Sequence, residues 1–132
     1  MIAIDANVVI ALQDEGHRIH RQARELFRKA IDEREDLAIS VLSLAETLVH
    51  HARAGGGIDV AQRLTELGAR EYELPIGQAH ELARLRAATS LRMPDVVVLH
   101  LAGMVGALAT GDRRLADAAR AQGVTRVIGL GL

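Results

Sequence analysis

The sequence has 132 residues, enough for one hydrophobic core and too few for two ordinary domains, so we expect a single domain over residues 1–132. Its hydrophobic fraction of 49% excludes a disordered chain, the lack of cysteine excludes disulfide bonds and thiolate zinc sites, and no apolar run is long enough to span a membrane. The net charge of −1 gives no overall attraction to nucleic acid, and two aromatic residues cannot form a base-stacking surface.

Short apolar runs alternate with segments of helical periodicity along the chain. In chain order, the sequence predicts a strand at 2–5, helices at 7–13 and 19–31, a strand at 37–39, helices at 42–53 and 59–67, a strand at 70–74, helices at 76–89 and 94–105, a strand at 106–110, a helix at 113–121 and a strand at 125–128. Glycines 55–57 are expected to end one helix, and Pro75 suits the start of another.

This alternation of strands and helices is typical of an α/β domain, with a central parallel sheet of about five strands and helices on both faces. In such sheets the reactive groups gather at the carboxyl ends of the strands, near the point where the strand order reverses. No secretion signal is evident at the start of the sequence, so a cytoplasmic protein is the simplest expectation.

Four acidic residues stand where predicted strands end or predicted helices begin. Asp5 ends the first strand and Asp112 follows the fourth, while Glu46 and Asp95 lie near the starts of helices. If the first strand is central and the fourth lies beside it, all four acids meet at one rim of the sheet. Carboxylates that share a cleft repel one another and need a cation, so this pattern points to a divalent-metal site.

Each acid also has a purely structural explanation. Ser43 and Glu46 fit a capping box, which would place Ser43 at a helix start. Asp5 and Asp112 are suitable helix N-caps, and Asp95 suits the dipole of a first helical turn. The set weighs against capping alone, because four acids at such junctions, with polar neighbours beside two of them, are more than capping requires.

These segments resemble the PIN-domain ribonucleases, and among them the VapC-type toxins of prokaryotic toxin–antitoxin pairs. The resemblance covers essentially the whole chain and rests on four motifs in order: Ile4-Asp5-Ala6-Asn7, Ser43-Leu44-Ala45-Glu46, Pro94-Asp95-Val96-Val97-Val98-Leu99 and Ala109-Thr110-Gly111-Asp112-Arg113-Arg114-Leu115. It implies that Asp5, Glu46, Asp95 and Asp112 form the catalytic, metal-binding cluster, with Asn7 and Thr110 as polar supports. The sequence departs from the family at Ala6, where such proteins often carry Ser or Thr, and at Arg114, where some carry another acid. Asp117, one turn further on, is interpreted as an exposed helix residue.

The expected chemistry follows from the ligand types and from the resemblance. Oxygen ligands without cysteine favour Mg²⁺, with Mn²⁺ as a substitute, over zinc. The reaction expected is hydrolysis of an RNA phosphodiester by an activated water, with Glu46 as a ligand or as the base, leaving a 5′-phosphate and a 3′-hydroxyl. Arg113 is expected to contact a substrate phosphate, because it stands at a helix start.

The toxin interpretation adds protein partners. It predicts a small antitoxin that places an apolar segment in a groove of this chain and a basic residue at the acidic site. The helix residues proposed for that groove, most of which are also expected in the core, are Leu26, Phe27, Ala30, Leu44 and Leu48. A homodimer is expected from the resemblance alone, since the sequence has no coiled-coil heptads.

Two other classes of protein fit parts of the sequence. A signalling receiver domain has a similar length and acids at strand ends, but it is expected to carry an acid pair after the first strand and a lysine near the last. This chain has Asp5-Ala6 and a single lysine, Lys29. A PIN-like module that binds RNA or protein without catalysis is the second alternative, and the intact set of four acids argues against it.

Overall fold

The computed structural model describes residues 1–55, 59–74 and 76–132. In these residues the elements are, in chain order, β1 (Ile2–Ile4), α1 (Ala6–Gln13), α2 (His20–Asp32), β2 (Leu37–Ser40), α3 (Val41–Arg53), α4 (Asp59–Glu66), β3 (Ala69–Tyr72), α5 (Ala79–Ala88), α6 (Met93–Val105), β4 (Ala107–Thr110), α7 (Arg113–Ala121) and β5 (Arg126–Gly129). Every predicted strand and helix is present in the predicted order.

The largest difference from the predicted boundaries is at the start of α5, which is expected at residue 76 but begins at Ala79. Gly77 has a φ of +82°, outside the right-handed helical region, so the helix cannot extend through it. The helix start assigned to Pro75 lies outside the described residues. Gly55, with a φ of +84°, follows the end of α3 as expected, while glycines 56 and 57 lie outside the described residues.

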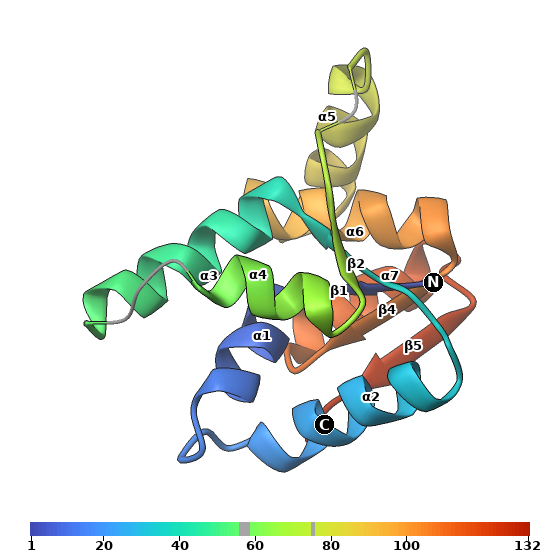
Figure 1. Cartoon of the computed structure of the whole chain (residues 1–132). Helices are drawn as coiled ribbons and strands as arrows, with labels where there is room; N and C mark the ends of the chain where they lie inside the picture. The colour runs from blue at the N-terminus through green and yellow to red at the C-terminus, as the bar shows by residue number, and fades with distance from the viewer. Residues whose placement is uncertain (56–58, 75) are drawn as a thin grey trace.

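The five strands form one parallel sheet in the order β3-β2-β1-β4-β5 (Figure 1). β1 pairs with β2 on one side and with β4 on the other, so that Ile4 lies between Ile39 and Ala109. The central position that the sequence analysis required of the first strand is therefore confirmed. The order of the strands reverses at β1, which is where parallel α/β sheets place their sites.

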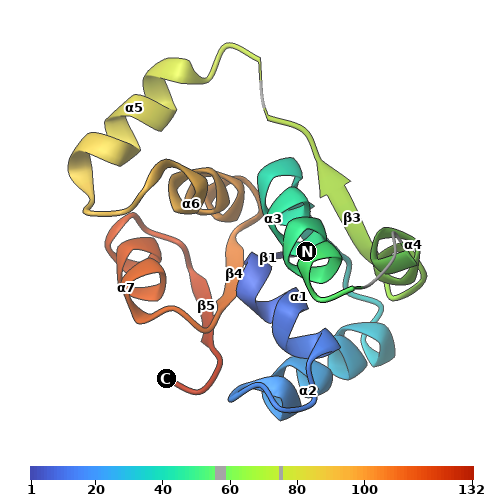
Figure 2. The same ribbon diagram turned by 90° about the vertical axis from the view of Figure 1, so that its left-hand side faces the viewer.

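Alternate residues of the central strands face two separate cores. Ile2 and Ile4 pack against the layer formed by α1, α2, α3 and α4, whereas Ala3 packs against the layer formed by α5, α6 and α7. Both layers are visible in Figure 2. α6 lies against β1, β2 and β4, and almost its whole apolar length from Val96 to Ala102 is buried. This burial fixes the start of α6 at the rim of the sheet.

α5 packs against α6 and otherwise stands away from the sheet (Figures 1 and 2). None of the helices in the described part of the chain has the length and apolar character needed to cross a membrane.

The start of α3 corrects the capping box assigned to Ser43 and Glu46. The N-cap is Ser40, the last residue of β2, and its Oγ accepts a hydrogen bond of 3.0 Å from Ser43 N. Ser43 lies inside the helix, and its Oγ accepts a second bond of 3.0 Å from Ser40 Oγ. Glu46 is therefore in the second turn of α3, where its carboxylate has no capping role.

Replacing the N-cap tests how much this strand-to-helix junction contributes to stability. The Ser40→Ala variant is expected to lower the free energy of unfolding by about 1 kcal/mol, because it leaves the buried amide of Ser43 without its acceptor. Urea unfolding followed by circular dichroism measures the change. Thr65→Ala is the matched control, since the hydroxyl of the exposed Thr65 donates to Ala61 O of its own helix, and its loss is expected to cost less than about 0.5 kcal/mol. Equal losses in the two variants would contradict the capping role of Ser40.

Candidate functional site

The pairing of β1 with β4 brings Asp5 next to the segment that carries Asp112. Ile4 lies opposite Ala109, so the next residues, Asp5 and Thr110, are neighbours at the carboxyl ends of the two strands. Thr110 Oγ1 donates a hydrogen bond of 2.8 Å to Asp5 Oδ2 and accepts one of 3.0 Å from Asp112 N. One buried hydroxyl therefore connects the side chain of Asp5 to the backbone of Asp112.

Asp5 is the most deeply buried of the four acids, with 7% of its surface exposed. It occupies the N-cap position of α1, but its side chain makes no capping hydrogen bond, so the side-chain capping role expected for Asp5 is wrong. Burial raises the pKa of Asp5 to about 6, against the lowering effect of the Thr110 hydrogen bond, and repulsion from Asp95 and Asp112 adds to the rise. Its carboxylate is thus held in a position where the charged form is unfavourable.

Asp95 and Glu46 approach the same place from two helices. Asp95 is in the first turn of α6, next to Pro94, and burial followed by repulsion from Asp112 raises its pKa. Burial and then repulsion from Asp95 raise the pKa of Glu46. Glu46 and Pro94 line one hollow of about 410 Å³ between α3 and the start of α6. The four acids therefore form one electrostatically connected group.

Two arginines that the sequence analysis did not assign to the site face this acid group. The charge of Arg92, at the N-cap position of α6, opposes the rise in the pKa of both Glu46 and Asp95. Arg114, in the first turn of α7, has the same effect on Asp95. Their positions in the sequence, three residues before Asp95 and two after Asp112, were the available signal.

Asn7 and Arg113 lie at the margins of the group. Asn7 Oδ1 accepts a hydrogen bond of 3.2 Å from Gly111 N and so holds the turn after β4. That turn is tightly packed, because a Cβ placed on Gly111 would lie 2.7 Å from Ile19 Cδ1. Arg113 is exposed at the first residue of α7, and Asp112 caps this helix as expected, its Oδ1 accepting a bond of 2.8 Å from the next amide but one.

The donor set suits a hard divalent cation, although the side chains are not closed around one. Four carboxylates and no sulfur ligand match the preference of Mg²⁺ and Mn²⁺ for oxygen. Within the described ranges, no three His, Asp or Glu side chains are spaced closely enough to hold one ion. Mutual repulsion, which contributes to the raised pKa values of three of the acids, favours this separation, and a cation bound among them would remove it.

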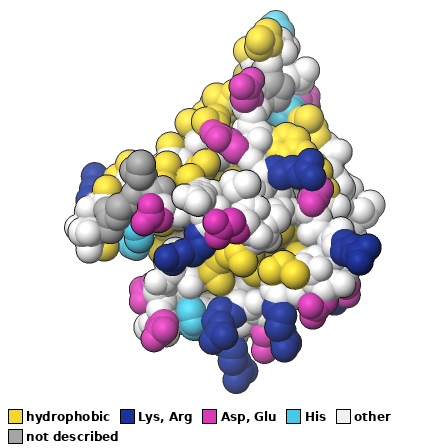
Figure 3. Space-filling view, in the orientation of Figure 1, with side chains coloured by type: hydrophobic (Ala, Val, Ile, Leu, Met, Phe, Trp, Pro, Cys, Tyr) yellow, Lys and Arg dark blue, Asp and Glu magenta, His cyan; other side chains and the backbone are white. Residues whose placement is uncertain are grey.

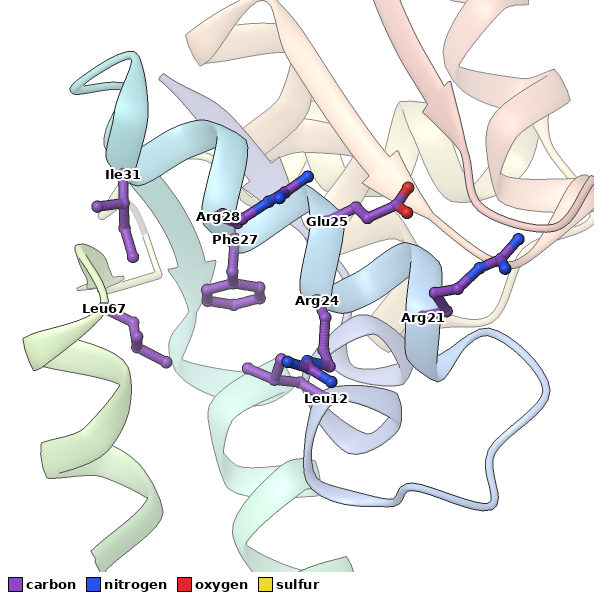
Figure 4. A pocket seen from close by; sticks show the side chains of 8 residues that line it. All are labelled: Leu12, Arg21, Arg24, Glu25, Phe27, Arg28, Ile31 and Leu67. Carbon is purple, nitrogen blue, oxygen red and sulfur yellow. The ribbon is translucent and has the colours of Figure 1, made fainter.

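A separate apolar groove of about 480 Å³ lies between α1, α2 and the end of α4 (Figure 4). Apolar and charged side chains line it, and these are Leu12, Arg21, Arg24, Glu25, Phe27, Arg28, Ile31 and Leu67. Basic side chains also project along the lower edge of the molecule, where α2 runs (Figure 3). Of the five residues expected in a groove, Leu26, Phe27, Ala30 and Leu44 belong to the buried core and Leu48 packs against it. Phe27 also lines this groove, and Leu26 and Ala30 line a second hollow of about 380 Å³ on the other side of α2.

The comparisons with known proteins identify the family. The chain belongs to the PIN domain family, whose model matches residues 2–121. Among solved structures, it is similar to a chain of a toxin–antitoxin complex from Klebsiella pneumoniae, with a TM-score of 0.65 and 21% sequence identity, over 88% of this chain and 91% of that one. It is also similar to PAE2754 from Pyrobaculum aerophilum, with a TM-score of 0.62 and 22% identity, over 96% of this chain and 82% of that one. No curated protein sequence matches the chain significantly.

The buried charge of Asp5 is expected to make stability depend on pH in the metal-free protein. Because the folded protein binds this proton more tightly than the unfolded chain, the free energy of unfolding falls as the pH rises from about 4 to about 6 and stays lower above that range. Asp5→Asn removes the buried charge and keeps an acceptor for the Thr110 hydroxyl. It is therefore expected to stabilise the protein at pH 7 by on the order of 2 kcal/mol.

Urea unfolding in the presence of a chelator, repeated between pH 4.5 and 7.5, measures this effect, and ~0.5-unit steps resolve a transition of about this width. Asp117→Asn is the control, because the carboxylate of Asp117 is exposed and, within the described part of the chain, pairs with Arg120 of its own helix alone. An Asp5→Asn variant that is less stable than the wild type at pH 7 would show that the Asp5 carboxylate stabilises the fold rather than strains it.

Proposed function

We propose that this protein is a metal-dependent endoribonuclease that acts in the cytoplasm as the toxin of a toxin–antitoxin pair. The observation that carries the proposal is the convergence of Asp5, Glu46, Asp95 and Asp112 at the strand-order reversal of a PIN domain. Each acid either raises the pKa of another member of the group or has its own pKa raised by one. Mutually perturbed pKa values of this kind are typical of groups assembled for function. Among the described residues, none of the four acids forms a salt bridge, and the side chain of Asp112 accepts a backbone amide instead.

The roles of the side chains follow from their positions. Asp5, Asp95 and Asp112 would hold Mg²⁺ or Mn²⁺ from the carboxyl ends of β1 and β4 and from the start of α6. A cation held there would supply positive charge to the phosphate oxygens of the substrate and would lower the pKa of a bound water. Glu46, the most exposed of the four, is placed to orient the attacking water as its base or to complete the ligand set. Thr110 fixes the rotamer of Asp5, and Asn7 fixes the turn that precedes Asp112.

RNA is the proposed substrate, and its recognition would rely on phosphate contacts and shape. The chain has one Phe and one Tyr and no Trp, so stacking on unpaired bases contributes little. Arg113, exposed at the start of α7 beside Asp112, is in position to contact a phosphate next to the bond that is cut. Cleavage by a water activated in this way would leave a 5′-phosphate and a 3′-hydroxyl.

The proposed partner is a small antitoxin, since the similar structure from Klebsiella pneumoniae is that of a toxin–antitoxin complex. The groove between α1, α2 and the end of α4 offers an apolar floor for a partner segment (Figure 4). Ile31, half exposed at 50%, and the rim of arginines would contact that segment. We also propose a homodimer, which the family resemblance suggests.

The nuclease proposal predicts that purified wild-type protein cuts single-stranded RNA in Mg²⁺ or Mn²⁺ and that a chelator stops the reaction. Asp95→Asn is expected to lower the cleavage rate by about 100-fold or more, because an amide is a poor ligand for a hard cation and removes charge needed at the site. Labelled RNA resolved on a denaturing gel gives the rate, and treatment with a 5′-phosphate-dependent exonuclease identifies the product ends.

Asp117→Asn, which changes an exposed acid outside the group by the same single atom, is the matched control. Cleavage by Asp95→Asn at the wild-type rate would reject the assigned site. A wild-type protein that binds RNA but cuts none, in either metal and free of any co-purified partner, would favour the non-catalytic PIN module instead.

The antitoxin proposal predicts that a small protein encoded beside this chain co-purifies with it and suppresses cleavage. Ile31→Asp is expected to weaken that complex by about 10-fold or more, since it puts a charge into the apolar floor of the groove. Isothermal titration measures the affinity. Ile76→Asp makes the same change at a fully exposed isoleucine before α5 and is the control. If both variants bind the partner equally well, the groove is not the binding surface.

A further inference from the structure

Arg114 makes side-chain contacts that neither the family resemblance nor the proposed chemistry explains. Its Nη2 donates a hydrogen bond of 2.9 Å to Ser90 O and another of 3.0 Å to Ser90 Oγ. Ser90 belongs to the short link between α5 and α6, while Arg114 is in the first turn of α7. These two bonds therefore cross from the start of α7 to the segment that leads into α6.

The two segments that Arg114 joins both carry site acids. Asp112 precedes α7, and its Oδ1 accepts the backbone amide of Arg114 at 2.8 Å. Asp95 lies in the first turn of α6, five residues after Ser90. Arg114 is thus tied to Asp112 through its backbone and to the approach to Asp95 through its guanidinium. A single residue therefore connects the segments that carry the two carboxylates.

The link that Arg114 holds is ordered by further contacts of its own. Thr89 Oγ1 donates to Leu85 O at 2.8 Å and accepts from Leu91 N at 3.4 Å, and the side chain of Leu91 is buried in the core beneath α6. α5, which precedes the link, packs against α6 and stands away from the sheet. Leu91 shares its buried cluster with Leu115 and Ala119 of α7, and the guanidinium of Arg114 adds a polar contact between this link and the first turn of α7.

We propose that Arg114 is a positioning residue that sets the spacing of Asp95 and Asp112 and so controls the affinity of the site for a divalent cation. This inference rests on the proposed function. It extends that function to position 114, where some members of the resembled family carry an acid. The guanidinium suits the task, because the two N–H groups of Nη2 meet both the carbonyl and the hydroxyl of Ser90. Groups that hydrogen-bond a metal ligand alter metal affinity by about 10- to 100-fold when removed, and Arg114, which acts one step further out through Ser90, is expected at the lower end of that range.

The positioning role and the charge of Arg114 act on the cation in opposite directions. A positive charge near Asp95 repels a metal ion, so removing only the charge would tighten binding. Removing the clamp releases the link that precedes α6 from α7, while α6 itself stays packed against the sheet, and would weaken binding through the first turn of α6. The sign of the change in affinity therefore separates the two roles.

The test measures the dissociation constant of Mn²⁺ by isothermal titration on the full chain for the wild type, Arg114→Ala and Arg113→Ala. Alanine at position 114 keeps the backbone amide that Asp112 caps and suits a helix. Arg113→Ala removes the same charge one residue away, at an exposed side chain for which the structure shows no bond to Ser90. Melting curves recorded without metal report any general loss of stability. Arg114→Lys, which can still donate a hydrogen bond to Ser90 O, is the conservative variant.

The expected result is a dissociation constant about tenfold higher for Arg114→Ala, partly restored in Arg114→Lys, with no weakening in Arg113→Ala. Binding by Arg114→Ala as tight as the wild type, or tighter, overturns the positioning role and leaves Arg114 as a charge alone. A lower melting temperature with unchanged Mn²⁺ affinity overturns it as well. A wild-type protein that binds no Mn²⁺ overturns the metal site of the proposed function itself, which is a separate and recognisable failure.

Discussion

The central place of β1 in the sheet is the constraint on which the site depends. Because β1 pairs in parallel with both β2 and β4, its carboxyl end is flanked by the ends of two other strands. Asp5 is the first residue beyond β1 and has no space to turn toward solvent, so its carboxylate meets Thr110 at the end of β4. The chain that continues from Thr110 then brings Asp112 to the same rim. The order of the strands, and not local helix capping, therefore explains why the carboxylate of Asp5 is buried at this point.

The two helical layers complete the group from opposite faces. α6 is held along its apolar length by β1, β2 and β4, and this packing carries Asp95 to the rim. α3 begins directly after β2 at Ser40, and its second turn carries Glu46 to the same place. The acids therefore come from segments that are rigid for different reasons, namely strand pairing, core packing and helix capping. Such independent anchoring is what a site needs when its members repel one another.

Much of this arrangement could be predicted from the sequence, because it depends on local patterns. The alternation of apolar runs and helical periodicity predicts the order of the strands and helices. The acids at the junctions between them predict that a site lies at the carboxyl rim of the sheet. The capping box of Ser43 could not be predicted correctly, because Ser40 and Ser43 are equally good caps and only the extent of β2 decides between them. Arg92 and Arg114 were missed for a related reason. Their side chains act across space, and an exposed arginine near a helix start looks like any other surface charge in a chain where 15 of 16 basic residues are arginine.

The charges of the site show how folding and chemistry are balanced. Asp5 is buried with a hydroxyl for a partner instead of a cation, so its ionised form costs stability, as its raised pKa records. Arg92 and Arg114 offset part of the repulsion around Asp95 without forming a direct ion pair with Asp5. Had either arginine closed onto the carboxylates, the metal-free protein would be more stable, but a cation would have to displace it before binding. The bonds to Ser90 keep the charge of Arg114 close enough to limit the repulsion around Asp95 without closing its guanidinium onto the carboxylates.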